Sequence, residues 1–133
     1  MKIYLAGAMS QLSHEEMNHW REEATHYLNQ HNIKTINPVN YYNFQMEKNF
    51  TDKECMLFDL TAVKHSDLIL VNLNYDSIGT AIELYDNFKS GRPIIGFGAH
   101  ENLHPWMREC CFKICDTLTD AVNYIASYYK SIL

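Results

Sequence analysis

Short apolar runs alternate with longer amphipathic stretches along the chain. Five runs have the length and composition of buried strands, at residues 2–7, 33–38, 67–73, 93–98 and 112–115. Most of the segments between them repeat apolar residues every three or four positions, which is the spacing of one buried helix face. Strands that alternate with helices predict a mostly parallel sheet with helices on both faces. The pattern therefore predicts a single doubly wound α/β domain over residues 1–133.

Capping signals mark where several helices begin. Ser13 and Thr51 each precede a glutamate by three residues, the spacing of a capping box. Thr117 or Thr119 would cap the last helix. Residues 40–50 are polar and aromatic, and are typical of a loop or a short helical piece. No linker, internal repeat or low-complexity segment interrupts this order, which agrees with one domain.

Composition and charge narrow the class of partner. The chain is 47 % hydrophobic and 20 % charged, as in ordinary globular proteins. The net charge of -5 argues against a nucleic-acid polymer, whose partners usually carry a basic face, but allows a small nucleotide. No apolar run is long enough to span a bilayer, and the N-terminal run is too short for a signal peptide. We therefore expect a cytoplasmic protein without a membrane partner.

The cysteines do not form the pattern of a disulfide framework. They are Cys55, Cys110, Cys111 and Cys115. Three of them lie near His100 and His104, so a metal site has to be considered. However, there is no Cys-x-x-Cys pair, and the spacings match no common zinc motif. We expect reduced thiols and no bound metal.

The loops that follow the strands are the expected ligand site. In doubly wound sheets ligands bind outside the carboxyl ends of the strands, where the strand order reverses. The loops "AGAMSQ", "NPVNYY", "NYDSIGT" and "GAHENLHPW" occupy these ends. Candidate substrate-binding residues from these loops and strand ends are Gly7, Met9, Ser10, Asn72, Asn74, Ser77, Gly79, His104 and Trp106.

Glu83 follows the third of these loops and admits two interpretations. Thr80 and Glu83 fit a capping box in the first turn of a helix over about residues 79–90, which would make Glu83 structural. Gly79 alone before a helix is no phosphate-binding motif. The local sequence favours the capping role, and only the rest of the chain raises the possibility that Glu83 does chemistry.

Three motifs, taken in order, resemble the nucleoside 2-deoxyribosyltransferase superfamily, which includes the 2'-deoxynucleoside 5'-monophosphate N-glycosidases. They are "IYLAG", "FDLTAVKHSDLILVNL" and "SIGTAIEL", and the resemblance covers roughly residues 2–98. It implies a flavodoxin- or Rossmann-like fold, a nucleoside or nucleotide substrate, no cofactor, and a homodimer or larger homo-oligomer. "HPWMRECC" also resembles a segment of small phage and bacterial deoxyribosyltransferase-like members.

The resemblance implies catalytic roles for three residues. Glu83, in "GTAIEL", matches the family nucleophile that attacks the anomeric carbon. Tyr4 matches a tyrosine that positions this carboxylate, and Asp59 matches an aspartate that contacts the base and assists proton transfer. Two successive displacements would retain configuration, and either a second base or water would accept the sugar. A helix N-terminus would also help to keep Glu83 ionised.

Two features leave the substrate open. Ser77 stands where the monophosphate N-glycosidases carry a serine that contacts the 5'-phosphate, and Ser10 is a possible second donor. The loop "GAMSQLS", however, lacks the arginine of those hydrolases. His104 and Trp106 belong either to a packed loop, the interpretation that we favour, or to a lid that stacks on the base.

Two other functions fit the same fold. One is a non-catalytic nucleotide-binding module, since fold does not determine function. The presence of Tyr4, Asp59 and Glu83 together argues against it, because a degenerate binder would be expected to have lost at least one of them. The other is a glycohydrolase of a different nucleotide, such as a nicotinamide dinucleotide, against which the short loops argue.

Overall fold

A five-stranded parallel sheet forms the centre of the molecule. The computed structural model describes residues 1–10, 12–40 and 50–133. The strands are β1 (Lys2–Ala6), β2 (Lys34–Ile36), β3 (Leu68–Asn72), β4 (Ile94–Phe97) and β5 (Lys113–Cys115). Their order in the sheet is β2-β1-β3-β4-β5, and all four neighbouring pairs are parallel. The predicted α/β class is confirmed, and the strand order reverses between β1 and β3.

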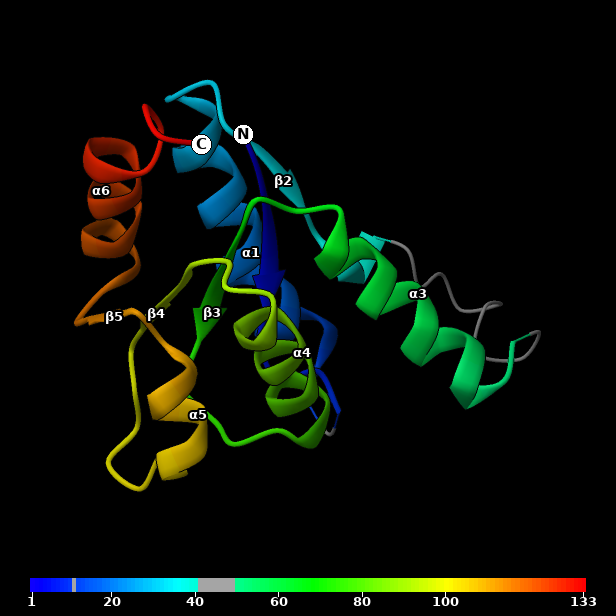
Figure 1. The fold of residues 1–133 in the computed structure, drawn as a ribbon. Helices are drawn as coiled ribbons and strands as arrows, with labels where there is room; N and C mark the ends of the chain where they lie inside the picture. The colour runs from blue at the N-terminus through cyan, green and yellow to red at the C-terminus, as the bar shows by residue number, and fades with distance from the viewer. Residues whose placement is uncertain (11, 41–49) are drawn as a thin grey trace.

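Helices cover both faces of this sheet (Figure 1). They are α1 (His14–Asn29), α3 (Asp52–Lys64), α4 (Ile78–Lys89), α5 (Pro105–Cys110) and α6 (Leu118–Tyr128), with a short 3₁₀ turn η1 (Pro38–Asn40). Side chains of successive strand residues point to opposite faces. Ile3 and Leu5 therefore pack with α1 and α6, whereas Tyr4 and Ala6 pack in the layer of α3, α4 and α5.

The predicted helix starts are confirmed where a capping side chain marks the N-terminus of the helix. Ser13 and Thr51 both form complete capping boxes, with the side chain and backbone of each paired to the glutamate three residues on. Thr117, and not Thr119, caps α6 by accepting a hydrogen bond from the amide of Asp120. Most of the loop or short helical piece predicted for residues 40–50 lies outside the described residues.

The layers leave the carboxyl ends of the strands at one edge of the sheet. The loops after β1, β3 and β4 meet there, so residues distant in sequence become neighbours. For example, the amide of His100 donates to the carbonyl of Leu73, which joins the loop after β4 to the end of β3. None of the described helices has the length and apolarity that crossing a membrane requires.

Candidate active site

Glu83 lies in the second turn of α4, and it does not cap the helix. The cap is Ser77, whose hydroxyl accepts a hydrogen bond from the amide of Thr80 at 3.3 Å. Helix α4 begins at Ile78, so Glu83 is its sixth residue. The capping box expected between Thr80 and Glu83 is therefore wrong. Ser77 provides the cap three residues earlier, which leaves the Glu83 carboxylate available for another role.

The Glu83 carboxylate points to the sheet and meets Tyr4. Tyr4 lies on β1 at the centre of the sheet, is only 1 % exposed, and hydrogen-bonds the Glu83 side chain through its hydroxyl. One carboxylate oxygen of Glu83, Oε2, is buried and has no hydrogen-bond partner among the described residues. A buried oxygen without a hydrogen-bond partner costs free energy. Such an oxygen is typical of a position where another group binds.

Burial sets the protonation of Glu83. The pKa of this carboxyl group is raised to about 7, chiefly by burial and in part by the neighbouring charge of Asp59. The hydrogen bond from Tyr4 and the charge of Arg21 act in the opposite direction. Glu83 lies beyond the first turn of α4, where the dipole effect of a helix N-terminus fades, so burial opposes its ionisation with little compensation from the helix.

Asp59 brings a second carboxylate to Glu83. It lies half-buried on α3, which packs against α4, and its charge acts on both Glu83 and Tyr4. Enzymes that break glycosidic bonds commonly use two carboxyl groups in different environments. The structure thus brings together the three residues to which the resemblance assigned catalytic roles, from β1, α3 and α4.

Arg21 belongs to this cluster and was not predicted. It is fully buried on α1 and donates hydrogen bonds to the carbonyls of Leu5 (3.2 Å), Gly7 (2.9 Å) and Met17. A sequence signal existed, because Arg21 stands on the apolar stripe of its helix, four residues after Met17 and three before Ala24. A charged residue at such a position needs buried partners.

The predicted residues Asn72 and Asn74 line a small hollow at the switch point of the sheet. The hollow has a volume of about 160 Å³ and is lined by Ala8, Leu12, Glu16, Trp20, Asn72, Asn74 and Tyr75. The side-chain oxygen of Asn72 accepts from the amide of Asn74 at 3.1 Å. Gly7 borders Trp20 closely, since an added Cβ would lie 2.9 Å from the indole. A side chain at position 7 would therefore disturb this region.

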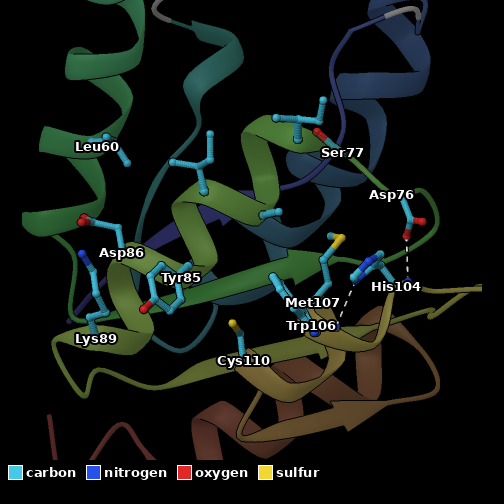
Figure 2. A pocket seen from close by; sticks show the side chains of 13 residues that line it. Leu60, Asp76, Ser77, Tyr85, Asp86, Lys89, His104, Trp106, Met107 and Cys110 are labelled. Atoms are coloured by element: carbon cyan, nitrogen blue, oxygen red, sulfur yellow. Dashed lines mark hydrogen bonds between the residues drawn. The ribbon is translucent and has the colours of Figure 1, made fainter.

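Ser77, His104 and Trp106 line a larger groove. It has a volume of about 700 Å³ and lies between α3, α4 and α5, whose side chains point into it (Figure 2). Trp106 is 79 % exposed, so the expected packed loop is wrong for this residue. His104 is also exposed, and its Nδ1 caps α5 by accepting from the amide of Trp106 at 3.1 Å. Stacking on a base stays a prediction.

The carboxylate of Asp76 joins the loops after β3 and β4 at the end of this groove. Oδ1 of Asp76 accepts from Nε2 of His100 at 3.0 Å and from the amide of His104 at 3.1 Å (the latter drawn in Figure 2). The two hydrogen bonds lower the pKa of Asp76, the backbone one contributing more. The loop after β3 is therefore tied to the loop after β4, which positions α5 against α4.

The candidate residues thus lie in one cluster at Glu83, around the two hollows, and at three further positions. Tyr4, Asp59 and Glu83 form the cluster, and none of them lines either hollow as the described residues define them. Met9 and Ser10 lie in the loop after β1. Gly79 faces open space, because an added Cβ would meet no atom within 4 Å in the described structure.

No disulfide bond joins Cys55, Cys110, Cys111 or Cys115 in the described structure. Burial raises the pKa of Cys111 to about 12, which keeps this thiol protonated near neutral pH. In the ranges 1–10, 12–40 and 50–133, no three side chains of His, Cys, Asp or Glu gather as metal ligands.

Comparisons with known proteins identify relatives of the fold. Neither a known protein-family profile nor a curated protein matches the sequence. The structure is similar to 2-deoxyribosyltransferase from Bacillus psychrosaccharolyticus, with a TM-score of 0.76, 23 % identity and coverage of 93 % of this chain and 92 % of that one.

Two further structures have the same fold. For 2-desoxiribosyltransferase from Leishmania mexicana the TM-score is 0.73 at 13 % identity, over 96 % of this chain and 98 % of that chain. For the CMP N-glycosidase BcmB from Clostridium botulinum the TM-score is 0.62 at 18 % identity, over 96 % and 99 %. The resemblance found in the sequence is therefore confirmed at the level of the fold.

Proposed function

We propose that the protein cleaves the N-glycosidic bond of a 2'-deoxynucleoside or its 5'-monophosphate, with Glu83 as nucleophile. The observation that carries this proposal is the Glu83 carboxylate, which hydrogen-bonds Tyr4 and has a buried oxygen, Oε2, without a partner among the described residues. An oriented carboxylate with a free oxygen is what attack on an anomeric carbon requires. The fold shared with deoxyribosyltransferases and a CMP N-glycosidase supports the same chemistry.

In the first step Oε2 of Glu83 attacks the anomeric carbon. A bond forms between this oxygen and the carbon, and the bond to the base nitrogen breaks with its electron pair leaving on the base. The departing base needs a proton or a hydrogen bond, which Asp59 is placed to supply through its position beside Glu83. The hydroxyl of Tyr4 hydrogen-bonds the Glu83 side chain and so orients the carboxylate.

In the second step an acceptor attacks the same carbon from the face that the base left. The acceptor bonds to the carbon and gives up its proton to the carboxylate of Asp59, while the bond to Glu83 breaks and leaves its electron pair on the regenerated carboxylate. The configuration of the sugar is retained. A second base as acceptor gives transfer, and water gives hydrolysis. This chemistry needs only carboxylates and a sugar, so the proposal includes no cofactor.

Ser77 is the phosphate ligand implied by the resemblance. Its hydroxyl accepts from the amide of Thr80 and keeps its own proton to donate. The proposal therefore covers both free 2'-deoxynucleosides and their 5'-monophosphates. A homodimer or larger oligomer and a cytoplasmic location stay predictions; light scattering would measure the former.

The test is incubation of the purified protein with 2'-deoxynucleosides and their 5'-monophosphates, each with and without a second free base. We expect base release or exchange, and we expect Glu83→Gln to lower the rate by about a thousandfold or more because it removes the nucleophile. Glu101→Gln, an exposed position in the loop after β4, is the matched control and should keep full activity.

Two outcomes would contradict the proposal. Turnover that survives in Glu83→Gln would remove Glu83 as nucleophile. Binding of nucleosides without turnover on any substrate would favour the non-catalytic binding module, and release of nicotinamide from a dinucleotide alone would favour the other glycohydrolase.

A further inference from the structure

We propose that a second copy of this chain docks, across a two-fold axis, on the helices that cover the Tyr4 face of the sheet. The docking surface consists of the exposed apolar residues of α3, α4 and α5 and of the groove between these helices. On α4 it faces away from the sheet, against which Leu84 is fully buried. Docking is measured without a substrate, so it does not depend on the proposed function.

Large apolar side chains are exposed mainly on these three helices. Of the thirteen exposed ones among the described residues, eight lie here, namely Met56, Leu57, Phe58, Ile78, Ile82, Tyr85, Phe88 and Trp106. The most exposed are Ile78 (84 %) and Trp106 (79 %). In α3, every residue of which is described, Val63 alone is fully buried. Single exposed apolar residues are common on folded proteins, but a cluster of them marks a surface that a partner covers.

The size of the docking surface suits a protein partner. A large aromatic side chain buries about 150–250 Å². Eight large side chains at about half exposure therefore offer roughly 600–900 Å². A standard protein–protein interface buries about 800 Å² on each partner. The groove of about 700 Å³ adds a concave part, into which a protruding side chain of the partner can fit.

Two charged side chains of the docking surface leave each other unpaired within one copy. Asp86 and Lys89 both line the groove at the end of α4, beside Tyr85 (Figure 2). Oδ2 of Asp86 is buried and has no hydrogen-bond partner among the described residues. Nζ of Lys89 lies 5.3 Å from the centre of the Tyr85 ring, and none of the described ion pairs joins Lys89 to Asp86.

Two-fold symmetry turns these two side chains into two matching contacts. In an isologous interface the same surface meets itself, so each contact between two residues occurs twice. With the axis beside Tyr85, Asp86 of each copy faces Lys89 of the other, and the buried oxygen of Asp86 gains a cationic donor. An unrelated partner would need an anion and a cation of its own at the same spacing. A second copy carries both.

Charge reversal on the docking surface tests this pairing. Sedimentation equilibrium measures the association of the native chain, of Asp86→Lys, of Lys89→Asp and of the double variant, from nanomolar to about 100 µM protein. We expect the native chain to form a dimer. Each single reversal should raise its dissociation constant at least about tenfold, because like charges then face each other. The double variant, and an equimolar mixture of the two single variants, should regain the dimer, since every cation again faces an anion.

Asp116→Lys, exposed after β5, is the matched control and should leave the dimer unchanged. Circular dichroism checks that each variant is folded, and Lys89→Asp, at an exposed position, decides alone if Asp86→Lys is not. A native chain that stays monomeric over the whole range would overturn the proposal and leave the groove to a small apolar ligand or a different protein. A dimer that no reversal weakens would place the contact on another face, and would overturn it as well.

Discussion

Helices α4 and α6 cover opposite faces of the same sheet, and they differ in whether their polar residues are buried or exposed. Helix α6 buries Ala121, Val122 and Ile125 and turns polar residues outward. Helix α4 buries Thr80 and Asn87 beside Leu84, and brings Glu83 to the sheet. Its outer face carries exposed apolar residues, namely Ile78, Ile82, Tyr85 and Phe88. Helix α6 thus follows the usual rule for stability, and α4 departs from it.

The buried polar groups of α4 differ among themselves in how they are satisfied. Asn87 donates to the carbonyls of Arg92 and Pro93 and accepts from Nε of Arg92, so it fastens the end of the helix. Glu83 keeps an oxygen without a partner among the described residues, as does Asp86 at the edge of the groove. Departures from local rules concentrate at functional sites, which is why α4 and not α6 presents the candidate chemistry.

The largest effect on stability should come from a substitution on the buried face of α6. Ile125→Ala in α6 removes a fully buried side chain, and we expect it to lower the free energy of unfolding by about 2–5 kcal/mol. Activity per folded molecule should not change. Urea unfolding measures the first quantity, and Asn123→Ala, exposed on the same helix, is the control. An equal loss in both variants would mean that α6 does not bury its apolar face.

Glu83→Gln should have the opposite effect on stability. Because burial raises the pKa of Glu83 from an ordinary value of 4.5 to about 7, the folded state holds a proton that the unfolded state releases between these two values. The free energy of unfolding therefore falls as pH rises through this window, by about 3 kcal/mol in total. Above the window it no longer changes with the ionisation of Glu83. The variant should lack this loss and be more stable than the native protein at pH 8.

The measurement is urea unfolding of both proteins at pH 5 and pH 8, with Glu101→Gln as the control. Identical pH dependence in the native protein and in Glu83→Gln would show that the carboxylate is not buried as described.

Tyr4→Phe should have a smaller effect on stability. It tests the orientation of the Glu83 carboxylate without changing its burial. The substitution removes the hydroxyl that hydrogen-bonds Glu83, and a hydrogen bond to a charged group is worth about 1.5–3 kcal/mol. We expect the pKa of Glu83 to rise further and the rate at neutral pH to fall about ten- to a hundredfold. Tyr128→Phe, exposed on α6 and remote from the candidate site, is the control. A rate equal to that of the native protein would remove Tyr4 from the site.

The smallest effect should come from the outer face of α4. Ile82→Gln removes an apolar side chain that is 44 % exposed, so the free energy of unfolding should stay within about 0.5 kcal/mol of the native value. Leu84→Gln, two positions on and fully buried, should prevent folding or cost several times more. Both are measured on the dissociated protomer, in which similar costs at the two positions would show that the outer face is covered within the chain itself.

Much of the architecture follows from the linear pattern, for a local reason. Apolar runs, capping boxes at Ser13 and Thr51, and the alternation of strands with helices depend on neighbours a few residues away, so they are readable along the chain. Strand ends in the prediction differ from the observed ones by one or two residues, as for β2, expected over 33–38 and found at Lys34–Ile36. The motifs around Tyr4, Asp59 and Glu83 also indicated which residues to examine.

The state of those residues depends on contacts that no short stretch of sequence contains. Thr80 and Glu83 have the spacing of a capping box, yet the cap is Ser77, and Glu83 meets Tyr4 from a strand almost eighty residues away in the chain. Arg21 was hidden for the same reason, since its partners are carbonyls of another element. The order of the elements is thus set by local pattern, whereas the protonation and partners of Glu83 are decided by burial and by charges that only the folded chain brings together.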